Sequence, residues 1–162
     1  MNKKYELLVD DTITFFGWKL FRIKALISFG SVEAGELGGY VAKEGNLSHE
    51  GDAWVSGDAW VSGDARVSDN ARVYDNAEVS DNAEVFGDAR VKSLKDYIVF
   101  KNNWSSGRYF TYTKSNKMWK AGCFYGTGQE LINEAYKDNE NSGKHYEAYV
   151  NFVKILEELE NE

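Results

Sequence analysis

The chain has 162 residues, of which 43% are hydrophobic, 15% aromatic and 28% charged, and this composition excludes a disordered protein. Its formal net charge of −7 disfavours direct binding to nucleic-acid phosphates, and its single cysteine, Cys123, excludes an intrachain disulfide. No apolar run is long enough to cross a bilayer, and the first residues lack the pattern of a signal peptide. We therefore expect a cytoplasmic protein without membrane contact.

The first segment, residues 1–50, is predicted to be a β cap for the segment that follows. Thr12–Phe16 and Trp18–Leu26 are rich in β-branched and aromatic residues and predict a hairpin. Leu47 lies six residues before Ala53, so we expect it to occupy an inward position ahead of the first repeat.

Residues 51–92 form seven hexapeptides without an insertion: GDAWVS, GDAWVS, GDARVS, DNARVY, DNAEVS, DNAEVF and GDARVK. A helix would turn successive valines by about 240° and could not bury them on one side. In a short strand, however, the alanine and valine of each hexapeptide point inward together, and Gly-Asp or Asp-Asn supplies a corner. Three such sides close a triangle of eighteen residues, which places residues i and i+18 on neighbouring parallel strands.

Most of the negative charge lies in this array, which carries four Lys/Arg and nine Asp/Glu, a net charge of 4 − 9 = −5. The array would be about 11 Å long, and B-DNA carries about six or seven charges over that length, so the array could act as a DNA mimic. The alternative is that aspartate serves only as a good corner residue. We expect the partner-binding surface to consist of outward aromatic and acidic side chains: Trp54, Asp58, Trp60, Asp64, Tyr74, Asp75, Glu78, Glu84 and Phe86.

The last segment, residues 93–162, is predicted to be a small α+β domain. Three short antiparallel strands are expected at Tyr97–Phe100, Arg108–Thr113 and Met118–Ala121. A capping box of Thr127 and Glu130 starts a helix to about Lys137, and a second helix runs from Gly143 to about Leu159. The apolar face of the second helix should cover the small sheet or, alternatively, the same helix of a second copy; it comprises Tyr146, Tyr149, Val150, Val153, Leu156 and Leu159.

The hexapeptide array resembles the left-handed parallel β-helix of the hexapeptide-repeat proteins. The tail, with Gly122-Cys123-Phe124, Gly126-Thr127 and Glu130-Leu131, is similar to the C-terminal module of a hexapeptide-repeat family of phages and prophages. The fold expected from both is mainly β: a short left-handed parallel β-helix with a hairpin cap and a C-terminal α+β domain of three strands and two helices.

The phage resemblance also implies a function. Small phage proteins of this size often inhibit host defence systems, including CRISPR nucleases. The implied function is a non-enzymatic, anti-CRISPR-like binding protein in the host cytoplasm. Its partner would be a host protein such as a CRISPR-associated or other nucleic-acid-binding nuclease, and the oligomer favoured is a homodimer.

No catalytic or metal-binding residues and no cofactor are predicted. Among the hexapeptide-repeat proteins, acyltransferases work as trimers with a histidine between subunits, but His49 precedes the array and His145 lies in the tail helix. Cys123, in a Gly-Cys-Phe sequence, is expected to be a small buried hydrophobe, and the corner aspartates do not converge as metal ligands should. An acyltransferase, a nucleotide-signal sponge and a structural phage accessory protein remain as alternatives.

Overall fold

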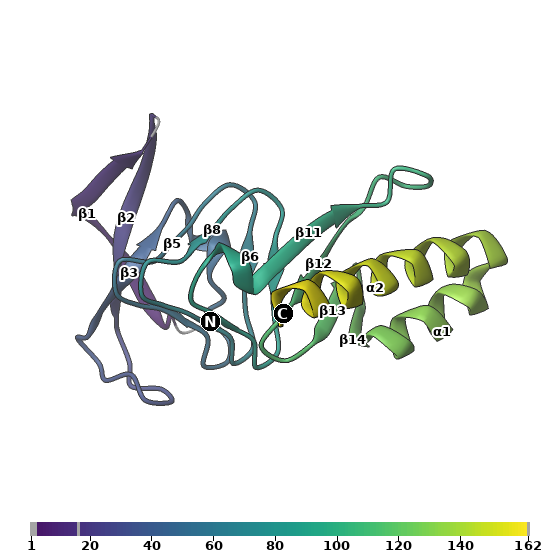
Figure 1. The fold of residues 1–162 in the computed structure, drawn as a ribbon. Helices are drawn as coiled ribbons and strands as arrows, with labels where there is room; N and C mark the ends of the chain where they lie inside the picture. Colours follow the sequence, from purple (N-terminus) through teal and green to yellow (C-terminus); the bar gives the residue numbers. More distant parts are fainter. Residues whose placement is uncertain (1–2, 16, 162) are drawn as a thin grey trace.

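The computed structural model describes residues 3–15 and 17–161, and it is mainly β with two helices. An N-terminal hairpin, the hexapeptide array and a C-terminal sheet with its helices follow one another along the molecule (Figure 1). The N-terminal segment and the array share one hydrophobic core, and the C-terminal sheet and helices enclose a second one.

The predicted hairpin is present and is longer than expected. β1 (Tyr5–Phe15) and β2 (Trp18–Ala25) pair antiparallel, with a register shift between Leu8 and Thr12. Phe16, which the prediction included, lies outside the described residues. Next in the sheet is β3 (Leu37–Val41), which is antiparallel to β2 but parallel to Trp60–Val61 of the array. The N-terminal segment therefore extends the array by backbone pairing.

Each hexapeptide contributes one strand of two residues: β4 (Trp54–Val55), β5 (Trp60–Val61), β6 (Arg66–Val67), β7 (Arg72–Val73), β8 (Glu78–Val79), β9 (Glu84–Val85) and β10 (Arg90–Val91). They pair in parallel across eighteen residues, in the rows β4-β7-β10, β5-β8 and β6-β9, as the period predicts. Every alanine and valine of the repeat is at most 1% exposed, so the expected inward positions are confirmed. Burial of these methyl groups is the main stabilising contribution of the repeat.

The corners use the first residue of each hexapeptide in the left-handed region. All seven have φ between 57° and 73°: Gly51, Gly57, Gly63, Asp69, Asp75, Asp81 and Gly87. Glycine adopts this conformation without strain, and aspartate is one of the few other residues that tolerate it. This explains why the repeat alternates only between Gly and Asp at this position.

Side chains of the N-terminal segment supplement backbone pairing at the N-terminal end of the array. The Lys4 Nζ atom donates to the carbonyl oxygens of Gly51 (3.3 Å) and Ala53 (2.6 Å). Asn46, in the 3₁₀ turn η1 (Glu44–Asn46), donates to the carbonyl oxygen of Ala65 at 2.8 Å. Leu47 is 1% exposed, which confirms its inward position.

The preliminary coil is longer than the repeat. Leu47 pairs with Val67, and Val41 pairs with Val61. The offset is therefore twenty residues instead of eighteen. Val41 and Leu47 are six residues apart, as in the repeat, so the two additional residues lie between Leu47 and Val55, which are eight residues apart.

The C-terminal end of the array is closed by one side chain on each of its three rows. The Tyr97 hydroxyl donates to the carbonyl oxygen of Glu78 in β8 at 2.8 Å. The Thr111 hydroxyl accepts from the amide of Glu84 in β9 at 2.9 Å. Ser115 accepts from the amide of Arg90 in β10 at 2.8 Å, so each terminal strand has a hydrogen-bonded cap.

The C-terminal sheet follows the 3₁₀ turn η2 (Leu94–Asp96) and has four antiparallel strands, not the three predicted. In order they are β11 (Tyr97–Lys101), β12 (Tyr109–Thr113), β13 (Met118–Ala121) and β14 (Phe124–Thr127). β14 was missed because its four residues run directly into the capping box of the next helix. Cys123 lies in the tight turn between β13 and β14 and is exposed, so the prediction that it is buried was wrong.

The two predicted helices are α1 (Gly128–Asp138) and α2 (Glu140–Glu160). The Thr127–Glu130 capping box is confirmed. α2 begins three residues earlier than predicted because the Asn139 side chain caps it, accepting from the Ser142 amide at 2.7 Å.

The face of α2 that covers the sheet is centred on Tyr146, Val150 and Val153, which are buried. This confirms the first of the two alternatives for that face. Leu159 does not belong to it, because its side chain is 59% exposed.

Candidate partner-binding surface

Trp54, the first aromatic residue of the predicted surface, is not on the surface. Its side chain is only 2% exposed and packs edge-on against the rings of Tyr5 and Phe29. The N-terminal segment covers this side of the first coil, and Gly38 lets the chain pass close to the indole: a Cβ there would lie 2.7 Å from it. The prediction of an outward, accessible Trp54 was therefore wrong.

The three predicted corner aspartates, Asp58, Asp64 and Asp75, are all exposed, and they occupy two neighbouring corners. The Asp58 amide donates to the carbonyl oxygen of Asp75, so these two residues are adjacent on one corner. At the next corner the Asp64 amide donates to Asp81, an exposed carboxylate that the sequence analysis did not select. Each corner thus carries two neighbouring carboxylates.

The strip between these corners holds Trp60 on β5 and Glu78 on β8, which are paired in register and half-buried. We call the surface formed by Trp60, Glu78 and the four corner aspartates the acidic face. Tyr40 of β3 pairs with Trp60 and continues the strip toward the hairpin. The Arg22 guanidinium lies 4.6 Å from the centre of the Tyr40 ring.

Two lysines partly neutralise the acidic face. Lys43 forms an ion pair with Asp64 at 2.7 Å, and its hydrogen bond and positive charge lower the pKa of that carboxyl group. Lys92 lies 3.9 Å from Asp75. Within the described residues Asp58, Glu78 and Asp81 form no ion pair, so the face keeps an excess of negative charge.

The remaining predicted residues lie apart from this face. Glu84 is half-buried beneath the C-terminal sheet, and its Oε2 atom is buried without a hydrogen-bond partner among the described residues. Phe86 is half-buried, with the Lys120 ammonium group 5.0 Å from its ring centre. Tyr74, which directly follows β7, is half-buried. The nine predicted residues therefore do not form one surface.

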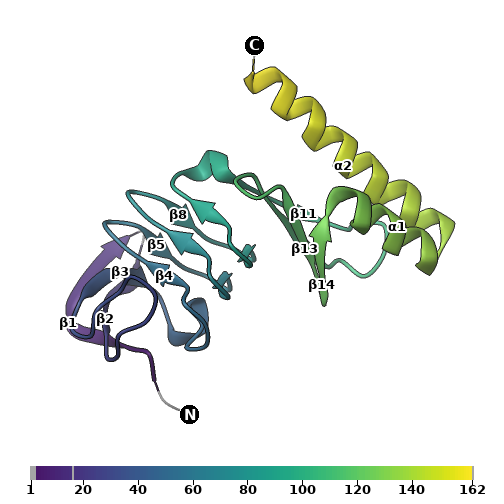
Figure 2. The ribbon, with the colours of Figure 1, turned by 90° about the horizontal axis from the view of Figure 1, so that it is seen from below.

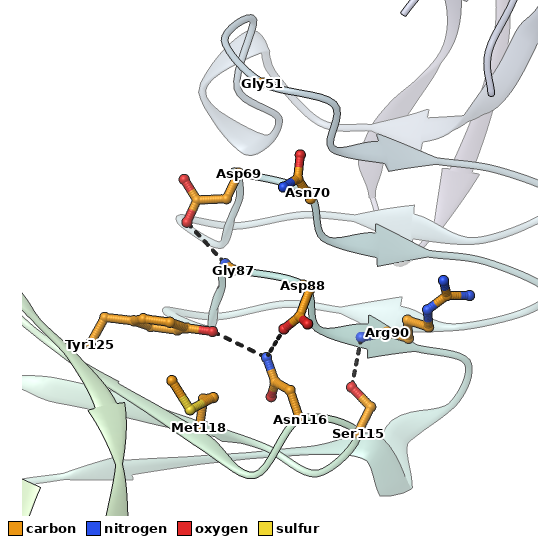
Figure 3. Close-up of a pocket in the computed structure, with 10 residues that line it drawn as sticks. All are labelled: Gly51, Asp69, Asn70, Gly87, Asp88, Arg90, Ser115, Asn116, Met118 and Tyr125. Atoms are coloured by element: carbon orange, nitrogen blue, oxygen red, sulfur yellow. Dashed lines mark hydrogen bonds between the residues drawn. The ribbon is translucent and has the colours of Figure 1, made fainter. Parts of the chain in front are cut away.

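An open cavity of about 940 Å³ lies where the third corner of the array meets the C-terminal sheet (Figure 3). Asn116 donates to both the Asp88 carboxylate and the Tyr125 hydroxyl at 3.1 Å, which ties the sheet to the corner. Burial raises the pKa of Tyr125, and the charges of Asp88 and Asp69 add to this. The cavity is lined by the carboxylates of Asp69 and Asp88 and also by Arg90. Sequence reasoning missed it because its walls come from two segments distant in the chain.

Both histidines stack on aromatic rings, and the His49 Nε2 atom also lies 3.7 Å from the Glu44 carboxylate. His49 stacks on Tyr5 at 4.2 Å, and its Nδ1 atom accepts from the Lys4 amide. His145 stacks on Trp104 at 4.4 Å. Each therefore packs as part of an aromatic pair.

Within the described residues, no group of three or more His, Cys, Asp or Glu side chains could hold a metal ion. A helix long and apolar enough to span a membrane is also absent from this part of the chain.

No protein-family model and no curated protein matches this chain. The resemblance to phage hexapeptide-repeat proteins consequently depends on the residues of the array and of the tail alone.

Proposed function

We propose that residues 51–92 form a short left-handed parallel β-helix, and that the protein acts by binding, without catalysis. Parallel pairing across eighteen residues and the buried alanines and valines support the β-helix. Side chains of the flanking segments donate hydrogen bonds to backbone carbonyl oxygens at both ends of the array, as expected for a capped β-helix.

We further propose that the partner is a basic region of a host protein, such as the nucleic-acid-binding groove of a CRISPR-associated or other defence nuclease. The observation that carries this proposal is the acidic face, where two pairs of adjacent aspartates flank Trp60 and Glu78. A backbone hydrogen bond joins the two aspartates of each pair, so the pairs can meet several lysines or arginines of a phosphate-binding groove at once. Trp60 adds an aromatic side chain of the type that anchors protein interfaces.

The test is inhibition of DNA cleavage by purified CRISPR-associated nucleases in the presence of the protein. The variant Asp58→Asn/Asp64→Asn/Asp75→Asn removes three negative charges and keeps side chains that tolerate the left-handed corner at residue 75. It should lose inhibition, and the wild-type effect should weaken with increasing salt.

The matched control removes three charges from the helices instead, by Glu134→Gln/Asp138→Asn/Glu158→Gln, and should inhibit like the wild type. If the corner variant inhibits as well as the control, the acidic face is not the binding surface. If no nuclease is inhibited, this choice of partner is wrong.

A further inference from the structure

His49 lies where residues 3–5 meet the chain that leads into the array, at the end of the molecule remote from the C-terminal sheet and helices (Figure 2). Its half-buried ring stacks on Tyr5 of β1, with the ring centroids 4.2 Å apart. The Tyr5 hydroxyl donates to the carbonyl oxygens of Glu44 at 2.9 Å and Leu47 at 2.6 Å, so hydrogen bonds hold the stacking partner in place. A titratable side chain thus lies between two segments that are distant in the sequence.

The hydrogen bonds of His49 define which ring nitrogen carries the proton. Nδ1 accepts from the backbone amide of Lys4 at 3.1 Å, so the proton of the neutral ring is on Nε2. Nε2 is buried without a hydrogen-bond partner among the described residues, and it lies 3.7 Å from Glu44 Oε2. A second proton can therefore bind only at Nδ1, where it would face the Lys4 N–H group and deprive that amide of its acceptor.

The surroundings of the ring also oppose a second proton. Burial lowers the pKa of His49 below its usual range, and the ammonium groups of Lys3 and Lys4 act in the same direction. The Glu44 carboxylate acts against them, but it already forms an ion pair with Lys3 at 3.0 Å. The Lys4 ammonium group has a pKa of about 8, so it keeps its charge throughout the range in which histidine titrates. Contact geometry and charge therefore both favour the neutral ring.

We propose that His49 is an acid-sensitive latch, which holds residues 3–5 in place while its ring is neutral and releases them when Nδ1 gains a proton. In the opened segment the ring accepts a proton at about pH 6.5, and in the closed segment only at a lower pH. Above pH 6.5 both forms are neutral and the latch is fully closed; as pH falls below 6.5, opening becomes easier, by at most about tenfold per pH unit. Release uncovers Trp54, which packs on Tyr5. The latch goes beyond the function proposed above, because none of its groups belongs to the acidic face.

The first experiment observes the His49 ring directly, by NMR of the full wild-type chain from about pH 8 to about pH 5. The nitrogen chemical shifts should show the proton on Nε2 at neutral pH, because Nδ1 accepts from the Lys4 amide. The ring should then gain its second proton below about pH 6.5. A neutral ring with its proton on Nδ1, or protonation at or above pH 6.5, would overturn the inference without any variant.

The second experiment measures opening at the Lys4 amide by hydrogen exchange, with each rate divided by the intrinsic exchange rate at the same pH. From about pH 6.5 to about pH 5.5 the opening constant of the wild type should rise several-fold, with about tenfold as the upper limit. This range lies above the titration of Glu44, because its hydrogen bond with Lys3 lowers the pKa of that carboxyl group. In His49→Asn the Oδ1 atom replaces Nδ1 as the acceptor and cannot be protonated, so the rise should disappear. The matched control, His145→Asn, changes the histidine that stacks on Trp104 and should behave like the wild type.

A further variant separates the hydrogen bond from the stacking contact. His49→Phe keeps an aromatic ring for Tyr5 but offers the Lys4 amide no acceptor, so this amide should exchange rapidly at both pH values. The latch is wrong if His49→Phe protects the amide as well as the wild type does, or if the opening constant rises equally in the wild type and in His49→Asn. All three variants leave the acidic face unchanged, so a failure of the latch and a failure of nuclease inhibition are separate results.

Discussion

The ammonium group of Lys4 lies 2.6 Å from the carbonyl oxygen of Ala53, in the position where a preceding coil would supply a backbone amide. The side chain is 1% exposed, and burial lowers the pKa of its ammonium group from 10.5 to about 8, while the Asp52 carboxylate acts in the opposite direction. A buried side chain therefore takes the place of backbone donors for two carbonyl oxygens, those of Gly51 and Ala53.

Lys4 gives stability a specific pH dependence. Between pH 8 and 10.5 the unfolded chain still holds the proton that the folded protein has released, so the free energy of unfolding rises with pH, by at most about 1.4 kcal/mol per unit. Below pH 8 both states hold the proton, and Lys4 contributes no slope.

We expect the free energy of unfolding of the wild type, minus that of Lys4→Met, to increase as pH rises from about 8 toward 9.5. Urea titrations at several pH values measure it. The highest pH of these titrations, 9.5, stays below about pH 10, where tyrosines of the unfolded chain lose their protons. Because burial raises the pKa of Tyr5 in the folded protein, that titration would lower the free energy of unfolding. If the free energy of unfolding changed equally with pH in the two proteins, the pH dependence would not come from Lys4.

Gly39 is predicted to be intolerant of any side chain. A Cβ atom there would lie 2.4 Å from the Ala59 carbonyl oxygen and 2.8 Å from Val55 Cγ1. Overpacking of this kind costs about 1–3 kcal/mol, so Gly39→Ala should lower the melting temperature by roughly 2–12 °C. Gly45→Ala is the control, because its Cβ would meet nothing closer than 3.9 Å. Thermal denaturation monitored by circular dichroism measures the melting temperatures of both variants. Equal melting temperatures would show that the backbone at Gly39 does not lie as close to Ala59 and Val55 as described.

Tyr97→Phe tests the cap at the other end of the array. The change removes the hydroxyl that donates to the Glu78 carbonyl oxygen at 2.8 Å, and we expect a loss of about 0.5–1.5 kcal/mol. Tyr109→Phe changes a side chain that is 41% exposed, whose hydroxyl forms no hydrogen bond among the described residues, and it should be neutral. Chemical denaturation of both variants measures the difference, and a neutral Tyr97→Phe would mean that the cap does not stabilise the fold.

The array could be predicted from sequence because each of its features repeats. The six-residue period predicts the inward valines, the corners and the eighteen-residue pairing together. Because the period holds in seven consecutive hexapeptides, it also determines the register of the strands. The helix caps were also predictable, because Thr127 and Glu130 are only three residues apart.

The surface could not be predicted in the same way, because it depends on segments that are distant in the sequence. Trp54 and Trp60 have identical neighbours, GDAWVS, yet Trp54 is buried and Trp60 only half-buried. The difference arises from Tyr5 and Phe29, which pack on Trp54 from outside the repeat. Similarly, nothing within the repeat indicates that β12 lies over Glu84.

The caps on the three rows restrict how this chain can evolve in length. Tyr97, Thr111 and Ser115 each meet a different row, and the rows recur only after three hexapeptides. In the proposed three-sided β-helix, gain or loss of a single hexapeptide would rotate the sheet and both helices by roughly a third of a turn, and all three groups would then meet the wrong strands. Viable relatives should accordingly differ by whole multiples of eighteen residues, so that duplication in this gene is acceptable only three units at a time.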